Sequence, residues 1–127
     1  MIYVLVMVGG ALGTLGRFLL STFVATHYGE SFQWGTLIIN ITGSFAIGFF
    51  ATLTDPGGTL LVRPEGRTFF MVGICGGYTT FSSFSLQTLR LAQSGQWMYA
   101  SANILASNIG CLVAVWIGHV CAANLRR

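Results

Sequence analysis

The residues Gly73–Phe84, GICGGYTTFSSF, lie in the middle of a long apolar segment but are poorly suited to an unbroken membrane helix. Gly76 and Gly77 have low helix propensity. The Thr and Ser residues that follow carry hydroxyls that can hydrogen-bond the backbone groups that an interrupted helix leaves free. Non-helical backbone at membrane depth survives only where protein or a water-filled path surrounds it. We therefore expect a helix break in this stretch and a working site around it.

The composition of the whole chain is that of a membrane protein. Of its 127 residues, 54% are hydrophobic and 7% are charged, whereas soluble domains carry about 25% charged residues. The formal charge of +3 comes from scattered arginines, which form no basic face for nucleic acid. The three cysteines lack metal-ligand spacing, and neither they nor the histidines have a partner for nucleophilic chemistry. We expect buried free thiols and no enzyme activity.

Four apolar segments each approach the roughly 20 residues that a helix needs to cross a bilayer core. They cover approximately residues 2–25, 33–54, 67–92 and 97–123, within a single domain of residues 1–127. The first segment has no basic n-region, so we expect it to remain as a span and not to be cleaved as a signal peptide. An even number of spans places both termini on one side of the membrane. The arginines are divided only weakly between the two sides, so charge specifies the orientation poorly.

The polar residues inside these spans suit an anion better than a cation. All three acidic residues lie in connections, so a proton-coupled or cation exporter would lack its intramembrane carboxylate. Arg17 lies late in the first span, where it either faces a buried path or extends to the headgroups. The other polar groups are neutral hydrogen-bond donors. They include Asn40, Thr42, Thr79, Thr80, Ser82, Ser83, Asn103, Ser107 and Asn108.

The fourth span combines a stripe of small residues with a polar track. The small residues recur every four positions, which predicts a groove for another helix. They are Ala102, Ala106, Gly110, Ala114, Gly118 and Ala122. Tyr99, Asn103 and Ser107 repeat at the same spacing beside the stripe. These residues, like Asn40 in the second span, either line a pore or join helices through hydrogen bonds.

In the third span, Phe81 and Phe84 are three residues apart and share a helical face directly after the expected break. Thr80 and Ser83 line a neighbouring face. The edge of a phenylalanine ring carries partial positive charge and can face an anion, although packing against neighbours is the common alternative. Carbonyl oxygens freed by the break can bind a hard cation such as Na⁺. Because one copy of four helices leaves little room for a channel, the small-residue stripes point to self-association.

Three motifs resemble, in order and spacing, the small Fluc (CrcB) family of fluoride channels. They are GGALGTLGR at Gly9–Arg17, GTLIINITGSF at Gly35–Phe45 and GICGGYTTFSSF at Gly73–Phe84, and the resemblance spans essentially the whole chain. It implies an antiparallel, dual-topology homodimer in the bacterial inner membrane, surrounded by lipid, with two fluoride pores along the subunit interface. Family members export fluoride passively from the cytoplasm and thereby reduce its toxicity.

By motif position, the resemblance implies that Phe81, Phe84 and Asn40 line the fluoride pore. Gly76 and Thr79 would give backbone carbonyls to a structural Na⁺ at the dimer centre. The remaining candidates for the fluoride path are Arg17, Thr80 and Ser83 within the motifs, and Tyr99, Asn103 and Ser107 from the periodicity of the fourth span. Two other functions stay open: a small dual-topology multidrug or cation exporter, and a non-conducting membrane assembly subunit, which the small-residue stripes alone would explain.

Overall fold

The computed structural model describes all residues, 1–127, and every regular element in it is a helix. In chain order these are α1 (Ile2–Tyr28), α2 (Trp34–Thr54), α3 (Pro64–Thr68), the π-helix η1 (Phe69–Cys75), α4 (Gly76–Tyr78), α5 (Phe81–Gln93) and α6 (Trp97–Asn124). The segment Pro64–Gln93, from α3 to α5, acts as one span, so that four helices are long and apolar enough to cross a membrane. The expected helical fold with four spans and a broken third span is confirmed.

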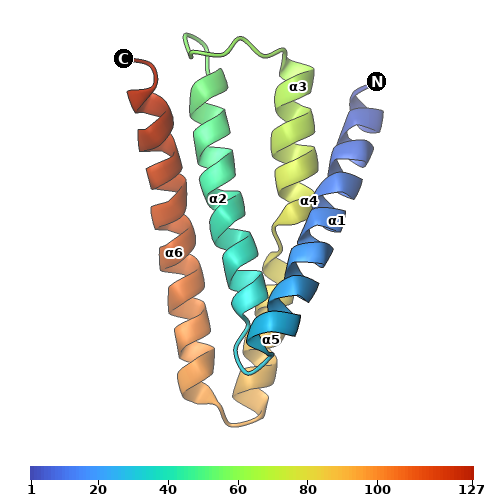
Figure 1. Ribbon diagram of the computed structural model, residues 1–127, viewed down its shortest axis with the longest axis vertical. Coiled ribbons are helices and arrows are strands. Elements are labelled where there is room, and N and C mark those ends of the chain that lie inside the picture. The colour runs from blue at the N-terminus through green and yellow to red at the C-terminus, as the bar shows by residue number, and fades with distance from the viewer.

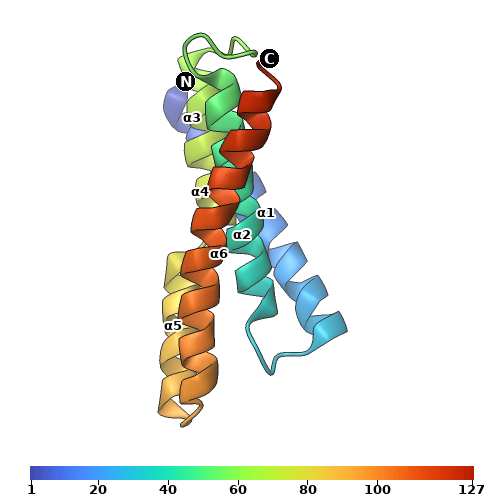
Figure 2. The same cartoon turned by 90° about the vertical axis from the view of Figure 1, so that its left-hand side faces the viewer.

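The four spans run side by side, with both termini at the same end of the molecule (Figure 1). Helix α2 packs along α6, and α1 packs on η1 and α4. Beyond the break, α5 leaves α1 and pairs with the first half of α6. The α5–α6 pair extends away from the connection between α1 and α2 (Figure 2). The third span therefore changes its packing partner at the point where it breaks.

The break lies two residues later than the glycine pair that predicted it. Gly76–Tyr78 is helical, whereas Thr79 and Thr80 are extended, with ψ angles of 156° and 114°. Gly77 serves close packing: a Cβ there would lie 2.5 Å from the carbonyl oxygen of Gly10 on α1. The backbone of α1 thus lies directly against the half-helix that precedes the break.

The same kind of contact continues along α1, where Gly9 and Gly13 are four residues apart and so lie on one face of the helix. Gly9 and Gly13 are both buried. A Cβ on Gly9 would lie 2.7 Å from the carbonyl oxygen of Phe69, and one on Gly13 would collide with the carbonyl oxygen of Ile74. Gly16 is the exception, since its nearest neighbour, the Tyr78 ring, would be 3.9 Å away. The absence of side chains at these positions lets two helix backbones touch.

The small-residue stripe of α6 packs as a helix groove only in its second half. Ala114, Gly118 and Ala122 are buried, and a Cβ on Gly118 would collide with the carbonyl oxygen of Phe45 on α2. In the first half, Ala102 is exposed. There the inner face of α6 is formed by Asn103 and Ser107. The inner face changes because α6 packs on α5 at this end and on α2 at the other.

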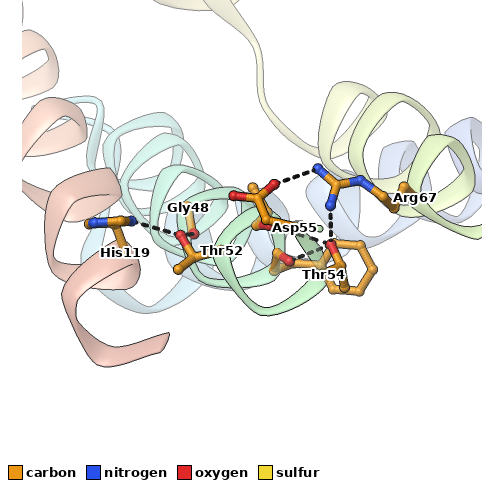
Figure 3. A network of polar contacts seen from close by, with 8 residues as sticks. Gly48, Thr52, Thr54, Asp55, Arg67 and His119 are labelled. Atoms are coloured by element: carbon orange, nitrogen blue, oxygen red, sulfur yellow. Dashed lines mark hydrogen bonds and ion pairs between the residues drawn. The ribbon is translucent and has the colours of Figure 1, made fainter. Parts of the chain in front are cut away.

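Polar contacts fix the end of α2 near the termini (Figure 3). The Arg67 guanidinium on α3 donates to Thr54 Oγ1 at 2.8 Å and forms an ion pair with Asp55 at 3.1 Å. The hydroxyl of Thr52 donates its hydrogen to the Gly48 carbonyl of its own helix. The same oxygen lies 2.8 Å from Nδ1 of His119 on α6. Because the hydroxyl hydrogen is already used, Nδ1 is the donor of this second bond. A cation at the C-terminal end of α2 also complements the helix dipole. These contacts tie α2 to both neighbouring spans.

Few residues are shielded within one copy of the chain. Only 20 of the 127 residues are buried, and most large apolar side chains point outward. An apolar outer surface is unfavourable in water but is what a lipid environment requires. Together with the four long apolar helices, this surface makes the chain a multi-pass membrane protein.

Candidate functional site

A groove of about 390 Å³ opens beside the helix break. Its wall is formed by α2, the third span and α6. The lining residues are Asn40, Gly43, Ser44, Ile47, Met71, Cys75, Gly76, Thr79, Thr80, Phe81, Phe84, Ser107, Asn108, Cys111 and Leu112. Seven of the predicted site residues thus meet in one place, although they come from three separate spans. Arg17, Ser83, Tyr99 and Asn103 are outside the lining.

Asn40 holds the extended residues of the break through both ends of its carboxamide. Its Oδ1 accepts from the backbone N–H of Thr80 at 2.8 Å, and its Nδ2 donates to the Thr80 carbonyl at 3.0 Å. The extended backbone at Thr80 has no helical partner for these groups, so the side chain supplies one. One N–H of the Asn40 amide is not used by this pair of bonds, and Asn40 lines the groove.

Thr80 also starts the helix that follows. Its Oγ1 accepts from the backbone N–H of Ser83 at 3.2 Å, which is the usual bond of a threonine N-cap. The Thr80 hydroxyl donates to Ser83 Oγ at 3.1 Å. Ser83 therefore supports the start of α5, while Thr80 itself faces the groove.

The two phenylalanines lie next to each other at this helix start. Their ring centroids are 5.2 Å apart, and the ring planes are tilted by 48°. Phe84 is buried, with 7% of its surface exposed, whereas Phe81 is 74% exposed. Both line the groove. One ring therefore forms part of the inner wall, and the other stands at the open side.

Arg17 approaches the break from the opposite side. Its Nε donates to the carbonyl of Gly77 at 3.1 Å, and Thr14 Oγ1 lies 3.4 Å from the same oxygen. This carbonyl belongs to the last turn of the half-helix before the break, where backbone oxygens lose their helical donors. A cation at such a helix end is favourable. Arg17 therefore binds the interrupted backbone, and its side chain does not line the groove.

The polar residues of α6 divide between the groove and the contact with α5. Ser107 lines the groove. Asn103, which is 2% exposed, donates from Nδ2 to Thr88 Oγ1 at 2.9 Å and so joins α6 to α5. Ser107 Oγ lies 3.5 Å from Asn103 Oδ1, a long hydrogen bond. Tyr99 lies a turn further along, exposed, with its ring 6.1 Å from that of Phe32.

Gly76 and Thr79 both line the groove beside the break. Thr79 Oγ1 donates to the carbonyl of Cys75 at 2.9 Å. Backbone oxygens are suitable ligands for a hard cation, but two from one chain are fewer than such an ion takes. A cation here would therefore need further oxygens from outside this copy of the chain.

The groove also contains polar residues that the sequence did not assign to the site. Ser44 lies one helical turn after Asn40 on the same face of α2 and lines the groove. That spacing could have revealed it. Asn108 lines the groove too, with its Nδ2 donating to the Ile104 carbonyl at 2.8 Å.

Comparison with known proteins agrees with these features. Residues 4–119 match the family described as CrcB-like protein, Camphor Resistance (CrcB). A protein of Opitutus terrae named fluoride-specific ion channel FluC is 58% identical over 124 residues, which cover 98% of this chain and 94% of that protein. Proteins of the same name from Rhodospirillum rubrum and Paramagnetospirillum magneticum are 58% and 55% identical, over 94% and 98% of this chain and 93% and 98% of their own lengths. The chain therefore belongs to the CrcB family.

Proposed function

We propose that the chain is a passive fluoride channel of the bacterial inner membrane that lets fluoride leave the cytoplasm. The observation that carries the proposal is the groove at the broken third span, which is lined by neutral donors and phenylalanine rings and by no carboxylate. The bacterial relatives described above bear the name of such a channel. A cation exporter is disfavoured because Glu30 and Asp55 lie in connections and Glu65 lies in the first turn of α3, at the very end of the third span, so that no carboxylate stands in the middle of a span.

The fluoride path runs through the groove. Fluoride is small and strongly hydrated, so its water must be replaced by close donors. The free N–H of Asn40 can serve as a donor. The hydroxyls of Thr80 and Ser107 can do so when they turn from Ser83 Oγ and Asn103 Oδ1 toward the ion, and the edges of Phe81 and Phe84 offer partial positive charge. Ser83, Tyr99 and Asn103 would complete the path outside the groove, and Arg17 would act on it only indirectly, through its bond to the Gly77 carbonyl.

A second copy of the chain closes the groove. A polar groove open to lipid would leave backbone and side-chain groups without partners, which costs several kcal/mol for each group. An antiparallel copy fits the weak division of the arginines between the two ends. In such a twofold dimer the groove occurs twice, which gives two fluoride pores.

The same dimer completes the cation site. Gly76 and Thr79 from both copies would hold a structural Na⁺ through their backbone carbonyls. When bound, that ion would supply positive charge between the two broken helices and would hold them together.

Efflux from liposomes tests the channel. Purified protein is reconstituted into vesicles loaded with fluoride or with chloride, the voltage is clamped with a potassium ionophore, and release is followed with ion-selective electrodes. We expect fast release of fluoride and no release of chloride. If neither anion moves while the protein is folded and dimeric, the channel is refuted and a non-conducting assembly subunit takes its place.

A further inference from the structure

Three sulfur-containing side chains line the groove at the helix break, and the proposed fluoride path uses none of them. Met71 and Cys75 belong to the π-helix η1 of the third span, whereas Cys111 belongs to α6. Two of the three cysteines in the chain are thus in this one lining, although they lie far apart in the sequence. Soft ligand atoms are therefore concentrated around one space of about 390 Å³.

The spacing of the lining residues shows that these side chains share a helical face. On the third span, Met71, Cys75 and Thr79 line the groove at intervals of four residues, and residues four apart lie on one face of a helix. On α6, Cys111 follows Ser107 at the same interval, and both line the groove. Short π-helical segments such as η1 are also frequent at functional sites.

The groove has room for an ion beside these sulfur atoms. Cys75 is buried and Cys111 is partly exposed, and both thiols are free. Gly76, which follows Cys75 in the lining, faces open space, since a Cβ there would meet nothing closer than the Met71 carbonyl oxygen at 3.9 Å. One water occupies about 30 Å³ of liquid, so the groove can hold a cation together with several waters.

The set of ligands favours a soft cation with a single charge. Thiolate and thioether sulfurs are the ligands that select Cu⁺. A structural Zn²⁺ takes four ligands, and the chain brings no three His, Cys, Asp or Glu residues together. When a monovalent cation binds, it replaces the thiol proton of Cys111, the less buried cysteine, and that proton passes to water. The product has no net charge, whereas a divalent ion bound to one thiolate would leave a positive charge within the membrane.

We propose that Met71, Cys75 and Cys111 form a binding site for a soft monovalent cation such as Cu⁺ or Ag⁺. Cys111 binds the ion as a thiolate, and Cys75 and Met71 bind it through neutral sulfur atoms. The backbone oxygens proposed above for Na⁺ are hard ligands, so the two sites select different ions. The soft-cation site goes beyond the proposed fluoride path and does not depend on transport by the chain.

The test is equilibrium dialysis of the purified full-length protein against silver nitrate in a sodium buffer without chloride, with bound silver measured by mass spectrometry. Cys121 lies outside the groove and could bind silver by itself, so Cys121→Ser is the parent for all variants. We expect a single silver ion per chain. Met71→Leu and Cys111→Ser should each weaken binding by at least about tenfold, since loss of a group that only supports a metal ligand already costs about 10–100-fold in affinity.

Met98→Leu is the matched control because Met98 is 85% exposed and outside the groove, and it should bind silver like the parent. Size-exclusion chromatography and thermal melting establish that each variant is folded. Should Cys111→Ser fail to fold, Met71→Leu decides the matter, since exchange of Met for Leu nearly conserves volume. Two silver ions bound independently by each chain, or an unchanged affinity in Met71→Leu, overturn the proposal. Dialysis measures binding and not transport, so failure of the proposed channel in the efflux experiment would leave this result unaffected.

Discussion

Asn40→Asp is the substitution whose effect on the groove follows most directly from the geometry. The new carboxylate keeps the acceptor for the Thr80 N–H, at present 2.8 Å away, but loses the donor to the Thr80 carbonyl, at present 3.0 Å away. A carbonyl left without its donor costs about 1–3 kcal/mol of stability. The substitution also places a negative charge on the wall of the groove.

The charge should dominate the effect on transport. A carboxylate about 5 Å from a passing anion, at an effective dielectric constant of about 20, repels it by about 3 kcal/mol. Since about 1.4 kcal/mol corresponds to a factor of ten, fluoride efflux should fall by about two orders of magnitude. The assay is efflux from liposomes at alkaline pH, where the new carboxyl is ionised.

Asn40→Ala separates the charge from the lost hydrogen bonds. It removes both bonds to Thr80 and adds no charge, so its melting temperature should fall further than that of Asn40→Asp while its efflux falls less. If Asn40→Asp conducts within twofold of the wild type, Asn40 does not face the ion, and its bonds to Thr80 are its whole role.

Two further predictions concern the phenylalanines and the contact of α1 with the third span. Phe81→Ile and Phe84→Ile should each impair fluoride efflux and leave the dimer intact on size-exclusion chromatography. Of the two rings only that of Phe84 is buried, so only Phe84→Ile should also lower the free energy of unfolding, by about 1–2 kcal/mol. Normal efflux in both variants would remove the rings from the path. Gly13→Ala should destabilise by about 1–3 kcal/mol because its Cβ would collide with the Ile74 carbonyl, whereas Gly10→Ala, with open space at its Cβ, should melt like the wild type. Equal melting temperatures for these two alanine variants would show that the backbone contact relaxes freely.

Local sequence patterns predicted the spans well because hydropathy and length are properties of neighbouring residues. The expected span of about 97–123 corresponds to the helix Trp97–Asn124, and the other three agree to within a few residues at each end. The break was predicted in the correct stretch, Gly73–Phe84, although the prediction did not say which of its residues would be extended. Gly77 has no side chain because α1 passes there, and the extended residues are Thr79 and Thr80, which a distant side chain supports.

What the sequence could not give was the set of contacts between spans. The bonds of Asn40 to Thr80 join residues 40 positions apart, and those of Arg17 to Gly77 join residues 60 apart. Periodicity alone likewise left open whether Asn103 faces a pore or a helix, and its bond to Thr88 depends on how α5 lies beside α6. Which side chains of two spans come into contact depends on how the helices cross, and a local sequence pattern does not contain that information.

The contact of Gly9 and Gly13 with the third span has a consequence for biosynthesis. The segment that packs on these glycines is residues 69–78. The ribosome reaches it about 40 residues after the end of α1 at Tyr28. At about 5–20 residues per second, the nascent first span waits a few seconds before its partner leaves the ribosome. During that interval its glycine face meets lipid or the insertion machinery. The first and third spans therefore associate late, after the second span is already in the membrane.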